Sequence, residues 1–194
     1  MNFEELEHEV AVSLETYKSL DWPSFPRGEG PQAYYKLLQQ LAIREEKPGV
    51  ILEIGAYQGT AAAVVLSEKD KHGHVHVALD LNDITFKDER LHVVVGDSTT
   101  PKVYAKVKEL ADKFGGIFLV FHDSSHHYYP SKVEWEMYNN LLRPGGLWLC
   151  DDITPAFRIP EEPAGMVEFF YELPGRKRLY FGLHEGGCIG AVMK

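Results

Sequence analysis

Three carboxylates follow two short apolar segments in the second half of the sequence. Asp123 ends the segment at 116–123, and Asp151 and Asp152 end the segment at 146–152. If both segments are parallel strands, their carboxyl ends meet at one edge of a sheet, where neighbouring strands lie about 4.8 Å apart. Carboxylates at that spacing repel one another unless something compensates their charge. The pattern therefore predicts a site for a hard divalent cation such as Mg²⁺, which prefers oxygen ligands.

The residues between these segments predict a helix, which is the usual connection between parallel strands. Val133, Met137, Leu141 and Leu142 recur with helical spacing, and the pattern stops at Arg143-Pro144-Gly145-Gly146. A strand–helix–strand unit of this length crosses over with a right hand and places both strand ends on the same edge. We therefore expect the three carboxylates and the nearby His126 to converge.

A glycine turn follows the first predicted strand, VILEIG (50–55). Gly55 and Gly59 allow the backbone to turn sharply and to approach a ligand closely. Their spacing is not that of a dinucleotide-binding fingerprint, and the Gly-Lys-Ser/Thr of a phosphate-binding loop is missing, which argues against NAD and ATP. A tight turn with a purely structural role remains the alternative.

Further acids end the next two predicted strands, HVHVALD (74–80) and LHVVVGD (91–97). Asp80 lies about twenty residues beyond the turn, where a carboxylate can accept hydrogen bonds from both ribose hydroxyls. A ligand across these strand ends meets Glu53, Asp80 and Asp97, a set that favours hydroxyl donors and cationic character over phosphate. An adenosyl sulfonium fits this description. Helix capping or solvation is the alternative for Asp80, Asp83 and Asp97.

Composition limits the classes of partner. The chain has 194 residues, 44% hydrophobic residues and a formal charge of −9, with a sequence pI near 5.5. An acidic chain of this size predicts one domain with a substantial core, and it argues against nucleic-acid and membrane partners. Cys150 and Cys188 lie in apolar segments and are expected to be buried thiols. The acidic, polar N-terminus and the lack of a long apolar segment predict a cytoplasmic protein.

At this point the sequence resembles the class I S-adenosylmethionine-dependent methyltransferases. The resemblance rests on EIGAYQG, ALD, GDS and LLRPGGLWLCDD and covers roughly residues 49–153. It implies an α/β, Rossmann-like, doubly wound fold with a mostly parallel seven-stranded sheet and a C-terminal antiparallel hairpin. Residues 1–194 would form a single domain, with 1–48 as a helical extension or lid and 49–194 as the core.

Within that family, DSSHHY (123–128) and the acidic pair resemble the metal-dependent O-methyltransferases that act on macrolide sugars and related natural products. The resemblance implies Asp123, Asp151 and Asp152 as metal ligands and His126 as the base. Asp151 stands where that subgroup typically has the longer Glu. For the base, His122, His127 and Lys132 are alternatives, expected respectively in the core, in a solvated loop and on a solvated helix.

The implied cofactor is S-adenosylmethionine, accompanied by Mg²⁺ or another divalent cation. The residues expected to contact the cofactor are Glu53, Gly55, Tyr57, Gly59, Thr60, Asp80, Asp97, Ser98 and Asp123. Aromatic side chains at Tyr128, Tyr129, Trp135 and Phe157, with the segment 154–170, are possible walls of an acceptor pocket, although core packing is the alternative for Trp135 and Tyr138. The segment 21–31 is either a lid or a surface linker.

The sequence thus favours an O-methyltransferase acting on a small hydroxylated molecule such as a sugar or a catechol. Three alternatives stay open: a cofactor-binding regulatory module without transfer activity, a metal-independent methyltransferase, and an NAD-dependent oxidoreductase, which would need a denser glycine pattern. A homodimer through the N-terminal helix is also open.

Overall fold

The computed structural model describes residues 1–19, 32–69, 71–154, 165–183 and 187–194. Within them, one sheet is formed by seven strands: β1 (Val50–Ile54), β2 (Val75–Asp80), β3 (Leu91–Val95), β4 (Ile117–His122), β5 (Leu142–Cys150), β6 (Arg176–Phe181) and β7 (Cys188–Met193). The strand order is β3-β2-β1-β4-β5-β7-β6. The first five strands are parallel to one another, whereas β7 is antiparallel to both β5 and β6. The predicted α/β fold with a C-terminal antiparallel hairpin is confirmed.

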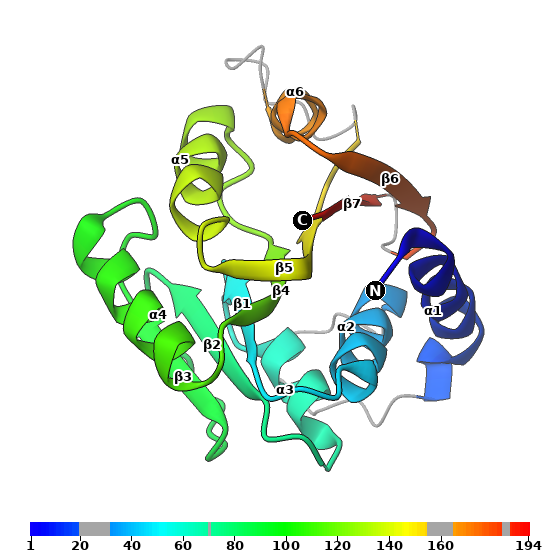
Figure 1. Cartoon of the computed structure of the whole chain (residues 1–194), viewed down its shortest axis with the longest axis horizontal. Coiled ribbons are helices and arrows are strands. Elements are labelled where there is room, and N and C mark those ends of the chain that lie inside the picture. Colours follow the sequence, from blue (N-terminus) through cyan, green and yellow to red (C-terminus); the bar gives the residue numbers. More distant parts are fainter. Residues whose placement is uncertain (20–31, 70, 155–164, 184–186) are drawn as a thin grey trace.

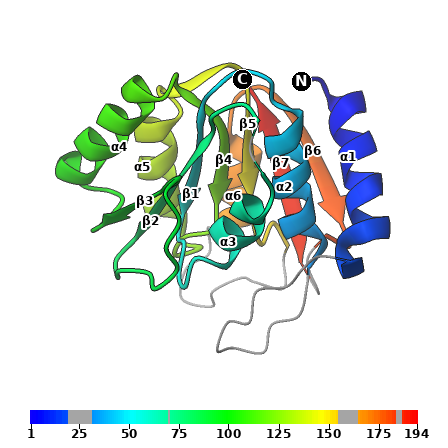
Figure 2. The ribbon, with the colours of Figure 1, turned by 90° about the horizontal axis from the view of Figure 1, so that it is seen from below.

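Helices cover both faces of the sheet (Figure 1). They are α1 (Phe3–Thr16), the short 3₁₀ helix η1 (Tyr17–Ser19), α2 (Ala33–Arg44), α3 (Thr60–Ser67), α4 (Pro101–Lys113), α5 (Tyr128–Tyr138) and α6 (Met166–Glu172). The first three α-helices pack with one face of the sheet in one hydrophobic cluster, and α4, α5 and α6 pack with the other face in a second cluster. Figure 2 shows this three-layer arrangement from below.

The helix starts follow local chemistry. Asn2 caps α1 by accepting a hydrogen bond from the backbone N–H of Glu5, whose carboxylate accepts one from the N–H of Asn2. α4 begins with Pro101, whose fixed φ suits the first turn of a helix. α3 begins after Gly59, which has φ +84° and therefore occupies the left-handed region.

One sequence prediction is wrong at the boundary between α5 and β5. The helical spacing included Leu141 and Leu142, but α5 ends at Tyr138 and Leu142 is the first residue of β5. Val133, which was expected to face the core, is 37% exposed, while the buried positions of α5 are Ser131, Glu134 and Tyr138. The apolar spacing was misleading because a buried acid, held by hydrogen bonds, occupies the inner face.

The third strand also differs from the prediction of buried strands. β3 lies at the edge of the sheet, and Val95 is 44% exposed. Its β-branched residues match strand geometry, but an edge strand has a neighbour on one side only. β propensity therefore predicted the strand correctly and its burial incorrectly.

The N-terminal helices pack on the rest of the described chain. Phe3 and Leu6 of α1 are buried in the same cluster as α2, and the Arg176 and Arg178 guanidinium groups of β6 lie over the Phe3 ring. The proposed lid at 21–31 lies outside the described residues. No helix in the described part of the chain is long and apolar enough to cross a membrane. Cys150 and Cys188 are buried free thiols, as predicted.

The ends of β1 and β4 approach each other very closely. Gly55 follows β1 with φ +89°, and a Cβ atom built on it would lie 1.9 Å from the carbonyl oxygen of Asp123. The backbone N–H of Asp123 in turn donates a hydrogen bond of 2.9 Å to the carbonyl of Ile54. Glycine is thus required here both by its φ angle and by the neighbouring backbone.

We predict that Gly55→Ala lowers the free energy of unfolding by more than about 3 kcal/mol, because backbone strain and a backbone clash act together. Gly73→Ala is a matched control: Gly73 has φ +78° but no atom within 4 Å of the added Cβ, so only the strain of about 1–2 kcal/mol applies. Urea unfolding of both variants measures the difference. Equal destabilisation would contradict the close approach as the reason for glycine at 55.

Candidate functional site

The register of the sheet aligns four strand ends. Ile54 of β1 is level with Leu79 of β2 and with His122 of β4, and His122 is level with Cys150 of β5. The residues that follow these positions, Asp80, Gly55, Asp123 and Asp151, therefore lie in a row along one edge. The sequence prediction that β4 and β5 are parallel neighbours, with Asp123 beside the acidic pair, is confirmed.

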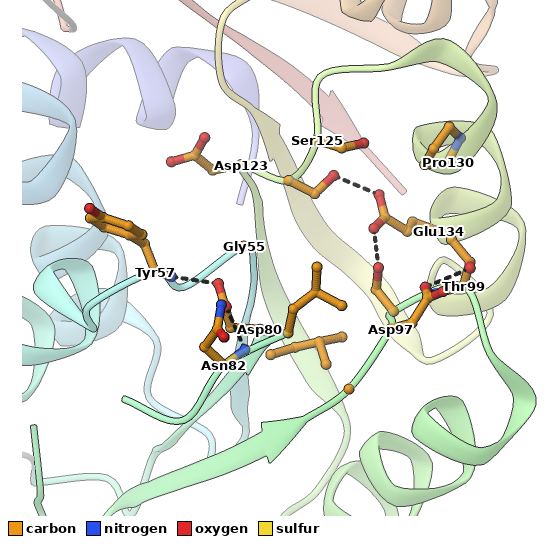
Figure 3. Close-up of a pocket in the computed structure, with 15 residues that line it drawn as sticks. Gly55, Tyr57, Asp80, Asn82, Asp97, Thr99, Asp123, Ser125, Pro130 and Glu134 are labelled. Atoms are coloured by element: carbon orange, nitrogen blue, oxygen red, sulfur yellow. Dashed lines mark hydrogen bonds between the residues drawn. The ribbon is translucent and has the colours of Figure 1, made fainter. Parts of the chain in front are cut away.

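A cavity of about 500 Å³ opens at this edge. We call it the larger cavity; it is lined by Gly55, Tyr57, Leu79, Asp80, Leu81, Asn82, Gly96, Asp97, Ser98, Thr99, Asp123, Ser124, Ser125, Pro130 and Glu134. Figure 3 shows that these side chains come from the ends of β1 to β4 and from α5. Among the described residues, this lining includes four acids and no lysine, arginine or histidine. This composition disfavours phosphate and accommodates a neutral or cationic ligand with hydrogen-bond donors.

Two predicted cofactor residues in this cavity are held by local hydrogen bonds. The Asp80 carboxylate accepts hydrogen bonds from the backbone N–H groups of Tyr57 (2.8 Å) and Asn82 (2.9 Å) (Figure 3). The Asp97 carboxylate accepts from the N–H and hydroxyl of Thr99, and these bonds hold the pKa of Asp97 below its ordinary value. Both carboxylates are therefore fixed in the cavity as hydrogen-bond acceptors.

A second cavity of about 340 Å³ adjoins the first and contains the predicted metal ligands. We call it the carboxylate cavity. Its lining consists of Gln32, Tyr34, Tyr35, Glu53, Gly55, Ala56, Tyr57, Thr60, Ala61, Phe121, Asp123, Ser124, His126, Asp151 and Asp152. Gly55, Tyr57, Asp123 and Ser124 line both cavities. A ligand in one cavity thus lies next to a ligand in the other.

His126 bridges two of the carboxylates. Its Nε2 lies 3.0 Å from Oδ1 of Asp123, and its Nδ1 lies 3.1 Å from Oδ2 of Asp152. These two hydrogen bonds raise the pKa of His126 to about 10. Burial raises the pKa of Asp123 to about 6, although the hydrogen bond from His126 acts in the opposite direction. As the side chains lie, His126 is a cation that donates from both ring nitrogens and cannot itself accept a proton.

Strained backbone conformations also occur around the carboxylate cavity. Among the described residues, the non-glycine residues with positive φ are Tyr57 (47°), His126 (59°) and Asp152 (55°), and all three line the carboxylate cavity. Such conformations cost of order 1–3 kcal/mol each and are found where the surrounding structure holds a functional group in place. The strain therefore supports a functional role for this edge, independently of its charge.

Three of the predicted cofactor residues lie outside the larger cavity. Glu53 and Thr60 line the carboxylate cavity only, and Gly59 lines neither cavity. The Glu53 carboxylate is buried, 2.8 Å from Nε2 of His76, and its burial raises its pKa. Ser98, in contrast, lies in the larger cavity beside Asp97.

The three predicted metal ligands line the same cavity. Asp123, Asp151 and Asp152 line one cavity, and their hard oxygen atoms suit Mg²⁺. As the side chains lie, no three His, Cys, Asp or Glu residues in the described ranges are grouped around a common point that could hold a metal ion. His126 occupies the position between Asp123 and Asp152. The chemistry of the donors thus fits a cation, whereas their present spacing is set by the histidine.

The other three candidates for the base lie away from both cavities. His122 is buried in β4, 2.7 Å from the Glu134 carboxylate, as expected of a core histidine. His127 is exposed and caps α5, and Lys132 is exposed with its ammonium 3.2 Å from the Tyr128 hydroxyl. None of these three residues lines either cavity.

The aromatic wall was predicted on the wrong element. Tyr128, Tyr129 and Trp135 line neither cavity; Tyr129 is 73% exposed, and Trp135 packs against Trp148 in the core. Phe157 lies outside the described residues. The carboxylate cavity is instead walled by Tyr34 and Tyr35 of α2, with Tyr34 stacked on Phe121. The Tyr-Tyr pair was visible in the sequence, but only tertiary packing brings α2 to this edge.

Sequence reasoning also missed Glu134. It lies within a predicted helix between Val133 and Trp135, where a single acid is typical of a solvated position. It is 1% exposed and accepts hydrogen bonds from His122, Ser124 and Ser98 at the wall of the larger cavity. An isolated acid in a helix gives no sequence signal that distinguishes it from a solvated one.

Several solved structures that are similar to this chain are methyltransferases. An O-methyltransferase from Bacillus cereus, solved with SAH, has a TM-score of 0.61 at 17% identity, covering 96% of this chain and 91% of that one. TomG from Streptomyces achromogenes, an O-methyltransferase of tomaymycin synthesis solved with SAM, has a TM-score of 0.58 at 17% identity, with 96% and 89% covered. MycE, a methyltransferase of the mycinamycin biosynthetic pathway solved with Mg, SAH and mycinamycin VI, has a TM-score of 0.59 at 16% identity, with 96% and 53% covered. The chain therefore has the class I methyltransferase fold.

A family model described as a methyltransferase domain matches residues 52–153, which is more than half of the chain. No curated protein matches the sequence. The protein belongs to this methyltransferase family, as the sequence motifs predicted.

We predict that His126 stays protonated at neutral pH in the metal-free protein. The pKa of His126 is raised above the ordinary 6.5. The protonated ring therefore gives its full stabilisation of the fold below pH 6.5, and this stabilisation is lost as the pH rises toward about 10. NMR titration of the His126 ring, assigned with a His126→Gln variant, measures the midpoint. Asp152→Asn should lower that midpoint, and a wild-type midpoint near 6.5 would contradict the bridged arrangement.

Proposed function

We propose that the protein is an S-adenosylmethionine-dependent O-methyltransferase that acts on a hydroxyl of a small molecule. The observation that carries this proposal is the common wall of the two cavities, formed by Gly55, Tyr57, Asp123 and Ser124. Methyl transfer needs the acceptor oxygen in line with the bond between sulfur and the methyl carbon. Two adjoining cavities, one for the donor and one for the acceptor, supply that geometry.

The larger cavity suits the donor. Asp80 at the end of β2 is in position to accept hydrogen bonds from ribose hydroxyls, and Asp97 and Ser98 at the end of β3 suit a base with donor groups. The lack of cationic side chains in the lining agrees with a sulfonium rather than a phosphate ligand. The solved relatives bound to SAH or SAM support the same choice.

The carboxylate cavity suits a neutral acceptor with hydroxyl groups. Tyr34, Tyr35 and Phe121 provide aromatic surface for a ring, and the carboxylates face it with acceptor oxygens. Glu53, Asp123, Asp151 and Asp152 together disfavour an anionic acceptor. A sugar or a phenol meets both requirements.

We further propose that Asp123, Asp151 and Asp152 hold a divalent cation. A bound cation of this kind acts as a Lewis acid that lowers the pKa of an acceptor hydroxyl and fixes its direction. His126 loses its two carboxylate partners when those carboxylates are engaged elsewhere, and its imidazole can then accept the hydroxyl proton. The strained φ of His126 keeps its ring over the cavity. MycE, solved with Mg and SAH, supports this assignment by analogy.

A metal-independent transferase is the second candidate, and one observation favours it. His126 already fills the space between Asp123 and Asp152, so an Asp–His–Asp arrangement could orient the base without a cation. In that case one carboxylate must protonate or move before His126 accepts a proton.

The donor assignment predicts that SAH binds the full chain in isothermal titration calorimetry. Asp80→Asn should weaken SAH binding about tenfold or more, because the amide cannot accept both backbone hydrogen bonds and ribose hydroxyls. Asp83→Asn is the control, since Asp83 is an exposed acid in the same loop that pairs with Lys87. A wild-type chain that binds no SAH at millimolar concentration would overturn the proposed function.

The metal assignment predicts that Mn²⁺, used as a paramagnetic probe, binds one site in the wild-type chain and is displaced by Mg²⁺. Asp152→Asn should weaken binding by at least about tenfold, while Asp112→Asn on the surface of α4 should leave it unchanged. Water proton relaxation measures the affinity. Equal Mn²⁺ binding in the Asp152 and Asp112 variants would favour the metal-independent enzyme.

A further inference from the structure

Glu134 forms a buried hydrogen-bonded cluster at one wall of the larger cavity. One carboxylate oxygen accepts from the Ser98 hydroxyl, and the other accepts from the Ser124 hydroxyl (2.8 Å) and from Nε2 of His122 (2.7 Å). The three partners come from the loop after β3, the loop after β4 and β4 itself. Glu134 thus joins two loops that line the cavity to the helix α5.

The Glu134 carboxylate is held by donors from buried and half-buried side chains. His122 is fully buried, with Trp148 and Phe169 edge-on to its ring, and its Nδ1 has no hydrogen-bond partner among the described residues. Its Nε2 faces the carboxylate and donates to it, because a carboxylate can only accept. Burial acts to raise the pKa of Glu134, but the hydrogen bonds from His122, Ser98 and Ser124 outweigh it, and the pKa lies below its ordinary value.

An acceptor-only carboxylate fixes the direction of both serine protons. A hydroxyl has one proton to donate, and in Ser98 and Ser124 that proton is directed at Glu134. Both serines are half-buried and line the cavity, so their oxygen lone pairs remain available to a ligand. Asp97, on the same wall, is also an acceptor. This wall therefore offers a ligand hydrogen-bond acceptors from three side chains, Ser98, Ser124 and Asp97.

We propose that Glu134 is a positioning residue that determines specificity. By accepting the protons of Ser98 and Ser124, it leaves both hydroxyl oxygens as acceptors toward the cavity. This wall then binds the amino group of an adenine base and rejects a carbonyl oxygen at the same place. The inference rests on the proposed function, since it takes the ligand to be an adenosyl compound. A carbonyl facing these oxygens makes no hydrogen bond and leaves buried polar groups unpaired, which is how polar sites discriminate between close analogues.

The test compares two ligands, SAH and its deaminated analogue S-inosylhomocysteine, by calorimetry. The wild-type chain should prefer SAH by about 10- to 100-fold. In Glu134→Gln the amide nitrogen donates to one serine, whose proton is then free to point into the cavity. The preference should therefore fall to about threefold or less, with weaker SAH binding and stronger S-inosylhomocysteine binding. A merely structural role would weaken both ligands equally and leave their ratio unchanged.

Glu136→Gln is the matched control, because Glu136 lies on the same helix and is exposed; it should keep the wild-type ratio. If Glu134→Gln does not fold, Ser98→Ala and Ser124→Ala decide the matter, and at least one of them must reduce the preference. Equal wild-type affinity for the two ligands, or an unchanged ratio in the variants, overturns the role of Glu134 while leaving the proposed function intact. Failure of the wild-type chain to bind either ligand overturns the proposed function instead.

Discussion

The register between the parallel strands is the constraint on which the rest of the site depends. Because β2, β1, β4 and β5 end at the same level, the residues after them share one edge. The backbone contact between Gly55 and Asp123 sets how closely the central pair approaches. A slip of one residue on any strand would turn its side chains to the opposite face and remove its acid from the row. The geometry of this edge is thus a consequence of sheet pairing.

The acids gathered at this edge of the sheet are stabilised by different partners. Asp80 accepts two backbone N–H groups, Glu53 lies against His76, and Glu134 accepts three donors that include His122. Asp123 and Asp152 share His126. These partners differ in how easily they can be replaced. Backbone amides are fixed in place, whereas a half-buried histidine can give way to another cation. The carboxylate cavity is consequently the part of this edge best suited to change its state during a reaction.

Backbone strain is concentrated around the carboxylate cavity. Tyr57, His126 and Asp152 all have positive φ angles and line it, and Tyr57 also lines the larger cavity, where its N–H donates to Asp80. The other described contacts of the larger cavity are ordered by hydrogen bonds, and α5 supplies the buried Glu134. His126 and Asp152 are therefore the strained residues that belong to the carboxylate cavity alone.

The sequence by itself determined the alternation of strands and helices, the C-terminal hairpin and the presence of acids at strand ends, because these follow from local periodicity and turn chemistry. It also placed Asp123 beside Asp151 and Asp152, since a parallel crossover leaves few alternatives. Only the tertiary structure decided that Tyr34 and Tyr35 wall the carboxylate cavity, that His126 lies between two carboxylates, and that Glu134 is buried. These depend on contacts between residues far apart in the chain, and the burial of a polar side chain is settled by the partners that satisfy its hydrogen bonds, which no local pattern encodes.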